Sequence, residues 1–283
     1  PLVTTFVLLR VFTTTQSFLV VSLVTLATAL LALMCSDRKL VILKFSTVPA
    51  LIAAIIFSNL PDDKLWYRLI DVGRKHAEYP NKQFKDNFES QYGVINIEAN
   101  DTGDLVFGFG KYDGRLNTSL ARNSNEIDRA YRIAGFHTAP KRVLIIGFST
   151  GSWANVIAWL PGVEQIEIVE INPDYMKMAS GRPEVSAILD NNKVNYHVDD
   201  GRRWLKRNPD QRFDLIVMNS SYHFRNSVTH VLSKEMLELA QSRLNKRGVF
   251  YFNTTGSPDA FRTAAEVFSV TSSYKYFVAA SDS

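Results

Sequence analysis

The chain has 283 residues, of which 46% are hydrophobic and 12% aromatic, so it is long enough for one large domain and a smaller unit. Its 32 basic and 28 acidic residues leave a net charge of only +4, which argues against nucleic acid as a partner. The single cysteine, Cys35, excludes an intramolecular disulfide and a cysteine metal cluster, and we expect no metal site.

Two long apolar runs open the chain. The segment 11–36 contains no charged residue and exceeds the ~20 residues that a helix needs to cross a bilayer. The run 40–60 carries one charge, Lys44, near enough to its end to reach the headgroups. A polar turn at 36–39 separates the two runs, so we predict a helical hairpin that spans the lipid bilayer twice. A buried pair of helices is the alternative, but neither run shows the polar face of a soluble helix.

The position of the charges does not orient this hairpin, because basic residues flank the second run on both sides. The cofactor inferred below is found in the cytoplasm, so we expect an integral membrane protein with a cytoplasmic soluble domain. Since the chain begins at Pro1 inside an apolar stretch, we also expect the natural protein to start further upstream. The predicted organisation is a transmembrane region at 1–63, a linker with a small β-domain at 64–125, and a cofactor-binding domain at 126–283.

Beyond Pro140, short apolar runs alternate with helical stretches. This alternation predicts an α/β fold with a doubly wound, Rossmann-like parallel sheet, whose ligand lies at the carboxyl ends of the strands. The five expected strands are 141–147, 165–170, 193–198, 213–218 and 248–253. Helices are expected after the first strand, from about Ser233, and from Asp259.

Glycines follow the first of these strands. Gly147, Ser149 and Gly151 form a turn where the backbone can approach a ligand, and the next helix offers free N–H groups there. A nicotinamide cofactor is the main rival for this turn, but its usual G-x-G-x-x-G spacing is absent. Asn253 to Ser257, after the fifth strand, either close the same pocket or form a turn before a helix.

Carboxylates follow the next two strands. Glu170 ends the second strand, where a carboxylate can accept both ribose hydroxyls, although a solvated strand-end acid is the simpler alternative. Asp200 and Gly201 follow the third strand, where a carboxylate can accept a hydrogen bond from an adenine amino group. An N-cap is the alternative for either aspartate here, and for Asp199 it is the better interpretation. Together the glycine turn and the two acidic strand ends favour a nucleoside cofactor.

Several of these segments resemble the spermidine synthase family of polyamine aminopropyltransferases. The matching stretches, which extend over about 87–280, are 89–97, Tyr112 to Gly114, VLIIGFSTGS, IEIVEINPDY, VDDGRRWL and FDLIVMNSS. The similarity is closest to a membrane-fused branch of that family. It implies a methyltransferase-like class I fold after a small N-terminal β-domain at about 92–119. It further implies that Gly147 and Gly151 line S-adenosylmethionine or its decarboxylated form, that Glu170 holds the ribose and that Asp200 reads the adenine.

The chain departs from this family at the reaction centre. Family members carry an aspartate after the fourth strand as general base and a second acid three residues later, and here these positions are Asn219 and Tyr222. An amide cannot take a proton from an ammonium, and general-base catalysis commonly contributes ~10²–10⁴-fold. Tyr222 and His223 are candidates for replacement chemistry, although His223 can equally be a loop histidine. Asp113 is the surviving acid that we expect to face the pocket.

Three functions follow from these observations. The first is aminopropyl transfer from the decarboxylated cofactor to an amine, with a polyamine bound near Asp113 and Glu126. The second is an S-adenosylmethionine-dependent transferase or lyase with a different acceptor. The third is a sensor that binds the nucleoside without turnover. The resemblance favours an enzyme of the first class, and it leaves the acceptor and a homodimer open.

Overall fold

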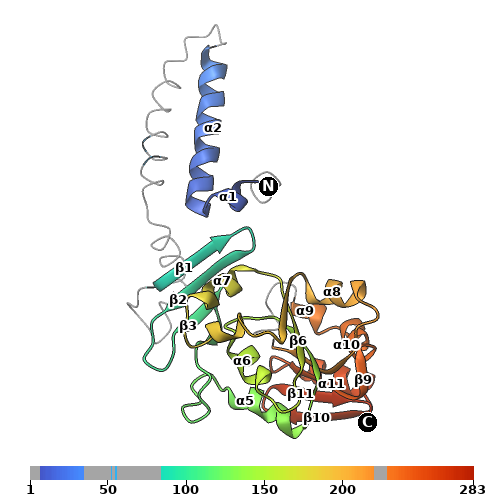
Figure 1. Cartoon of the computed structure of the whole chain (residues 1–283). Helices are drawn as coiled ribbons and strands as arrows, with labels where there is room; N and C mark the ends of the chain where they lie inside the picture. The colour runs from blue at the N-terminus through green and yellow to red at the C-terminus, as the bar shows by residue number, and fades with distance from the viewer. Residues whose placement is uncertain (1–6, 35–51, 53–54, 56–83, 220–227) are drawn as a thin grey trace. The chain divides into compact units, whose positions relative to one another are not determined.

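The computed structural model describes residues 7–34, 52, 55, 84–219 and 228–283 (Figure 1). The chain divides into two compact units, Pro1–Glu98 and Ala99–Ser283. The α/β sheet and the cavity described below belong to the second unit.

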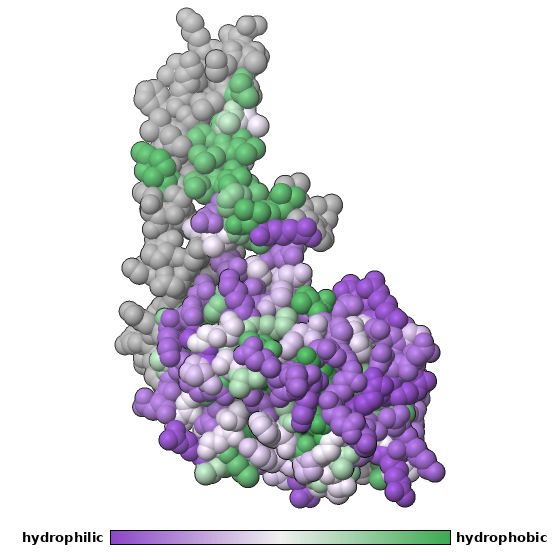
Figure 2. Space-filling view, in the orientation of Figure 1, coloured by the Kyte–Doolittle hydropathy of each residue, from purple (hydrophilic) through white to green (hydrophobic). Residues whose placement is uncertain are grey.

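In the first unit, two helices precede a β-hairpin. The helices are α1 (Leu9–Val11) and α2 (Thr14–Met34), and the hairpin pairs β1 (Phe84–Ser90) with β2 (Gly93–Glu98). Hydrogen bonds join α1 and the start of α2 to the hairpin near its turn. The backbone N–H of Thr14 donates to Glu89 Oε1 over 2.6 Å, and Arg10 Nε donates to Gln91 Oε1 over 3.0 Å. Apolar side chains gather along α2, as the green surface in Figure 2 shows.

The predicted transmembrane helices and the predicted membrane location require correction. Within the part of the chain that the structure describes, no helix is long and apolar enough to cross a membrane. The first turn of α2 is Thr-Thr-Gln-Ser, so its apolar part is shorter than the ~20 residues that the prediction assumed. The second predicted span, 40–60, lies outside the described residues apart from Ile52 and Ile55.

The second unit begins with another hairpin, formed by β3 (Leu105–Gly108) and β4 (Lys111–Arg115). Phe109 and Gly110 connect the two strands with φ angles of 51° and 71°. Positive φ at both central residues is the geometry of a type I′ turn, whose twist matches that of paired strands. This hairpin falls in the segment 92–119, where a small β-domain was predicted.

A seven-stranded sheet forms the centre of the second unit. Its order is β10-β11-β9-β8-β5-β6-β7. The strands β9, β8, β5, β6 and β7 are parallel, while at one edge β11 pairs antiparallel with both β9 and β10. The strands are β5 (Arg142–Ile146), β6 (Gln165–Glu170), β7 (Val194–Val198), β8 (Phe213–Met218), β9 (Leu244–Asn253), β10 (Val270–Tyr274) and β11 (Phe277–Ser281). The prediction of a Rossmann-like sheet is therefore confirmed.

Helices connect these strands, and two of them begin at serines that act as N-caps. Ser233 and Ser257 accept hydrogen bonds from the backbone at the starts of α10 and α11, as N-caps do. The helical segments are α5 (Asp128–Tyr131), η2 (Arg132–Gly135), α6 (Ser152–Ala158), α7 (Asp174–Ser180), η3 (Ser186–Ile188), α8 (Gly201–Arg207), α9 (Val228–Val231), α10 (Lys234–Gln241) and α11 (Pro258–Val267).

The core lies on both faces of the sheet, because side chains alternate between the faces along a strand. On β9, Phe250 and Phe252 join the apolar cluster that includes residues of α8, α10 and α11. Tyr251, between them, stacks on Trp153 of α6 and on Phe277 of β11, with ring centroids 6.2 and 4.9 Å apart. Central strands that are apolar on both faces are typical of a parallel sheet covered by helices.

The strand order reverses at β5, which lies between β6 and β8. In such sheets a crevice opens outside the carboxyl ends of the strands at the point of reversal. The segments after β5 and β8 begin with Gly147 and Asn219, which follow the paired residues Ile146 and Met218. The topology therefore places the glycine turn and Asn219, the position where the family's aspartate was expected, next to each other.

Candidate functional site

The glycine bend, residues 147–151, joins β5 to α6. Three of its five residues have positive φ angles: 91° at Gly147, 50° at Ser149 and 76° at Gly151. A Cβ on Gly151 would lie 2.7 Å from the ring of Phe148, whereas a Cβ on Gly147 would meet nothing within 4 Å. Glycine at 151 is therefore required by the fold, and glycine at 147 keeps space open.

Glu170, at the end of β6, points its carboxylate into this bend. Oε2 accepts a hydrogen bond from the backbone N–H of Phe148 over 2.7 Å, and Oε1 accepts one from Asn172 over 2.8 Å. The residue is only 5% exposed. Burial raises the pKa of Glu170 to about 7, and the nearby charge of Asp113 adds to that rise, while hydrogen bonds from the backbone of Asn172, Phe148 and Ser149 oppose it.

The two aspartates after β7 start helix α8. Asp200 is the N-cap, and its Oδ1 accepts from the backbone N–H of Arg203 over 2.8 Å. Asp199 forms ion pairs with Arg203 and Arg207. A Cβ on Gly201 would lie 2.5 Å from Ile146 Cγ2, so this glycine lets the helix pack against β5. The N-cap alternative that the sequence favoured for Asp199 is thus realised at Asp200.

A cavity of about 510 Å³ opens at the carboxyl ends of β5 and β8. Its volume is in the range of small-molecule sites, ~300–1,000 Å³. Of the predicted site residues its lining contains Gly147, Ser149, Asp113 and Asn219, but not Gly151, Glu170, Asp200 or Gly201. Glu170 contacts the lining residue Phe148 through a hydrogen bond. The lining residues are Tyr112, Asp113, Gly114, Ser124, Asn125, Glu126, Arg129, Ile145, Gly147, Phe148, Ser149, Thr150, Trp153, Val217, Asn219, Asn253, Thr255 and Tyr276.

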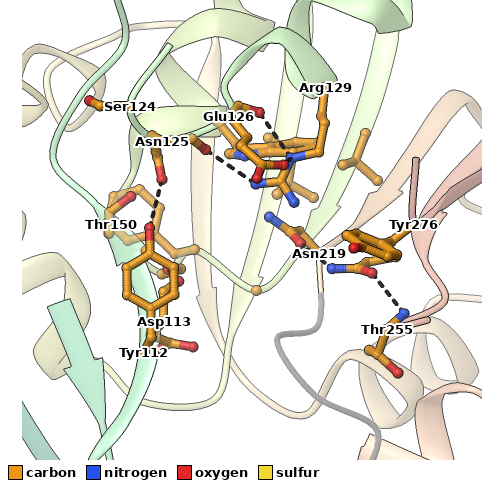
Figure 3. Close-up of a pocket in the computed structure, with 18 residues that line it drawn as sticks. Tyr112, Asp113, Ser124, Asn125, Glu126, Arg129, Thr150, Asn219, Thr255 and Tyr276 are labelled. Carbon is orange, nitrogen blue, oxygen red and sulfur yellow. Dashed lines mark hydrogen bonds and ion pairs between the residues drawn. The ribbon is translucent and has the colours of Figure 1, made fainter. Parts of the chain in front are cut away.

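Strand β4 contributes Asp113 to one wall of the cavity (Figure 3). Its backbone carbonyl accepts a hydrogen bond from Ser149 Oγ over 2.8 Å, which ties the strand to the glycine bend. Its carboxylate accepts a hydrogen bond from the hydroxyl of Tyr175 on α7. The structure thus brings Asp113 to the cavity, as the sequence predicted.

Asn219 stands at the end of β8 and is joined to the end of β9. Its Oδ1 accepts a hydrogen bond from Nδ2 of Asn253 over 3.1 Å, and Oδ1 of Asn253 accepts one from the backbone N–H of Thr255 over 2.7 Å. Asn253 and Thr255 therefore line the pocket, and the same segment also forms the turn before α11, whose N-cap is Ser257, so both interpretations of that segment hold. Tyr222 and His223, the other predicted catalytic residues, lie outside the described residues.

Arg129 is a lining residue that the sequence did not single out. Its guanidinium lies over the rings of Trp153 and Phe277, 5.9 and 5.3 Å from their centroids. Nε donates to the carbonyl of Glu126 over 2.9 Å, and Nη2 donates to the carbonyl of Asn125 over 3.2 Å. No motif surrounds Arg129, so only the fold, which places α5 beside α6, could reveal it.

The strand order, with a cavity where that order reverses at β5, defines the class of protein. It is a Rossmann-like α/β protein with a small-molecule site at the point of reversal. A model of the spermine/spermidine synthase domain matches residues 133–276, which is 144 of the 283 residues. The chain therefore belongs to the spermine/spermidine synthase family, as the resemblance of its motifs predicted.

Individual relatives match shorter stretches. The polyamine aminopropyltransferase of Streptococcus uberis is 34% identical over 125 residues, which are 43% of this chain and 42% of that protein. Spermidine synthase 1 of Hyoscyamus niger is 34% identical over 83 residues, which are 29% of this chain and 26% of that protein. The chain thus spans less than half the length of these curated relatives.

Solved structures agree on the fold. A spermidine synthase crystallised in complex with the transition state analogue AdoDATO aligns with a TM-score of 0.61 and 19% identity, over 71% of this chain and 75% of that one. The spermidine synthase of Thermotoga maritima aligns with a TM-score of 0.58 and 18% identity. At such identities the likeness shows the fold alone.

Proposed function

We propose that the second unit binds decarboxylated S-adenosylmethionine, or S-adenosylmethionine itself, and transfers its aminopropyl-type group to an amine. The observation that carries the proposal is the Glu170 carboxylate, which faces the glycine bend beside a cavity of suitable size. Membership of the spermine/spermidine synthase family supports the same class of reaction. A homodimer stays a prediction that no observation tests.

Glu170 is proposed to hold the ribose. A carboxylate has about four acceptor positions, and the backbone N–H groups of Phe148, Asn172 and Ser149 use three of them. The remaining position is proposed to accept from a ribose hydroxyl. The missing side chain of Gly147 leaves room for the nucleoside, and the N-terminus of α6 lies beside it. Asp200 uses one oxygen for its cap and is proposed to offer the other to the adenine amino group.

The transfer step is a displacement at the carbon next to the sulfonium. The lone pair of the amine forms the new C–N bond while the C–S bond breaks, and sulfur keeps that electron pair and leaves as neutral methylthioadenosine. The attacking nitrogen must lose a proton, which the amide of Asn219 cannot accept. Asp113 is the carboxylate in the cavity that we propose for this proton transfer.

A second candidate function is a transfer or cleavage that uses a different acceptor. Its supporting observation is the position of Asn219, since an amide stands at the cavity where the family's base is expected. Binding of the nucleoside without turnover is the outcome expected of a sensor. These candidates share the cofactor site and differ only in what happens to the sulfonium.

The first test measures nucleoside binding. Methylthioadenosine should bind the wild-type protein, and Glu170→Gln should weaken that binding at least about tenfold, because one charge-assisted acceptor is lost. Glu167→Gln is the matched control, since Glu167 is a buried glutamate of the same strand that instead contacts Gln165, Asn195 and His197. Equal affinity in both variants would overturn the ribose assignment.

The second test measures turnover. The purified protein is incubated with each form of the cofactor and with putrescine or spermidine, and mass spectrometry follows methylthioadenosine and S-adenosylhomocysteine. Methylthioadenosine that forms only when one form of the cofactor and an amine are both present supports the proposed transfer, and the form that reacts identifies the group transferred. Release of either thioether without an amine, or no turnover despite binding, contradicts it and favours the second candidate or a sensor.

A further inference from the structure

The orientation of the Asn219 amide is fixed by its neighbours. The backbone N–H of Thr255 can only donate, so the atom of Asn253 that accepts from it must be the amide oxygen. The other end of Asn253 is therefore its NH₂ group, which donates to the oxygen of Asn219. It follows that the remaining polar group of Asn219 is a donor, and among the described residues this NH₂ has no partner.

Arg129 offers a second donor in the same cavity. Its Nε and Nη2 atoms donate to the carbonyls of Glu126 and Asn125, and two aromatic rings hold the plane of the guanidinium. No residue in the described ranges accepts a hydrogen bond from Nη1. The side chain is 16% exposed and lines the cavity, and Figure 3 shows that Arg129 and Asn219 both point into it.

The charges around Arg129 are balanced. Glu126 Oε2 lies 3.7 Å from Arg129 Nε and 3.6 Å from Lys275 Nζ, and Lys275 also pairs with Asp128 over 2.9 Å. Two cations thus face two carboxylates. Asp113 is a further carboxylate in the lining, and it accepts a hydrogen bond from Tyr175. The two N–H donors, and not the net charge of the wall, therefore favour an anion, because charge-assisted N–H donors prefer an anionic acceptor.

We infer that Nη1 of Arg129 and the NH₂ of Asn219 form a subsite for a carboxylate group. This inference rests on the proposed cofactor site and adds a specificity to it. The carboxylate has two chemical sources: the amino-acid tail of S-adenosylmethionine, or an acceptor that carries a carboxylate as well as an amine. A diamine satisfies neither donor.

The test compares probes that differ by a carboxylate. S-Adenosylmethionine is compared with its decarboxylated form, and 4-aminobutyrate is compared with putrescine on protein saturated with methylthioadenosine. Each probe is titrated calorimetrically into the wild type and into Arg129→Gln and Asn219→Asp. Arg132→Gln is the matched control, because Arg132 also lies over aromatic rings, those of Phe136 and Tyr274, but does not line the cavity.

In at least one of these two pairs of probes, the molecule that carries the carboxylate should bind the wild type about tenfold more tightly than the molecule that lacks it. One charge-assisted hydrogen bond implies a difference of this size. The preference should vanish in Arg129→Gln, persist in Arg132→Gln and reverse in Asn219→Asp. The last variant keeps the shape and the oxygen that accepts from Asn253, so it stays informative if Arg129→Gln unfolds. The pair that shows the preference identifies the source of the carboxylate.

Two results would overturn the inference, and they differ. If methylthioadenosine binds but neither pair shows a preference that depends on Arg129 or Asn219, the carboxylate subsite is refuted and the cofactor site stands. If methylthioadenosine itself does not bind, the proposed function fails and the inference fails with it.

Discussion

At the scale of single residues, the protonation of Glu170 controls the proposed site. Its pKa of about 7 means that roughly half of the ligand-free molecules carry a neutral carboxyl at neutral pH. A ribose diol donates to this group, so binding favours the charged form and releases a proton when the pH is below about 7. The affinity for methylthioadenosine should therefore fall by up to about tenfold per pH unit below pH 7 and level off above it. Calorimetry at about pH 6 and pH 8 measures this change, which should be absent in Glu170→Gln.

The same shift acts on folding, with a definite sign. The pKa rises from 4.5 to about 7 on folding, so between these values the folded chain binds more protons than the unfolded chain. Glu170 therefore contributes stability that is fully present below about pH 4.5 and is lost as the pH rises to about 7. Urea titrations of the wild type and Glu170→Gln should diverge over this window in that direction. If the affinity and the stability of the wild type do not change with pH over this window, the raised pKa of Glu170 is refuted.

At the scale of elements, the glycine bend separates a folding requirement from a binding requirement. Alanine at 147 or 151 adopts an unfavourable positive φ, which costs ~1–3 kcal/mol. At 151 the new Cβ also meets the Phe148 ring, whereas at 147 it enters open space at the cavity. Gly151→Ala should thus lower the free energy of unfolding more than Gly147→Ala does. Gly147→Ala should show the larger loss of methylthioadenosine affinity per kcal/mol of stability lost.

The two variants are each other's control, because each adds one methyl group within the same loop. Chemical denaturation gives the stability of each, and calorimetry on the folded fraction gives the affinity. If both variants lose stability and affinity in equal proportion, the bend acts only as a structural turn, and the assignment of Gly147 to the ligand is wrong.

Elements that are apolar on both faces could be predicted from the sequence. The strand 213–218 was predicted at its observed bounds, because a buried parallel strand is a continuous apolar run with turn residues on either side. Strand β9 begins at Leu244, four residues earlier than predicted. Its first four residues are mostly polar and at least partly exposed, so no apolar run marks them. The antiparallel strand β10, Val-Thr-Ser-Ser-Tyr, is short, polar and at the sheet edge, so no hydrophobic pattern marks it.

Two of the cavity residues, Gly147 and Asn219, were predictable because they follow strands in a known topology, and Asp113, on β4, was expected there from the family resemblance. All three line one cavity. Arg129 was not expected, because it is 90 positions from Asn219 in the sequence and no local pattern links the two. The direction of the Asn219 amide was equally out of reach, since it depends on the backbone of Thr255 through Asn253.

At the scale of the whole molecule, the residues of the cavity belong to one compact unit. All the lining residues, together with Glu170 and Asp200, fall within Ala99–Ser283, and so does the match to the family at 133–276. The apolar cluster on one sheet face and the aromatic stack on the other also lie within this range. A unit with its own hydrophobic core and its own cavity is organised as an independent domain.

We therefore predict that the fragment 99–283 folds cooperatively and binds methylthioadenosine within about threefold of the affinity of the whole chain, since no contact to the ligand is removed. Circular dichroism during urea unfolding tests the folding, and calorimetry tests the binding. The fragment 133–283 is the matched control, because it keeps the family match but loses Asp113, Asn125, Glu126 and Arg129 from the cavity. It should bind about tenfold more weakly, because it lacks one wall of the cavity and the hydrogen bond by which the Asp113 carbonyl holds Ser149 of the glycine bend. A folded 99–283 fragment without affinity would show that residues before Ala99 complete the site.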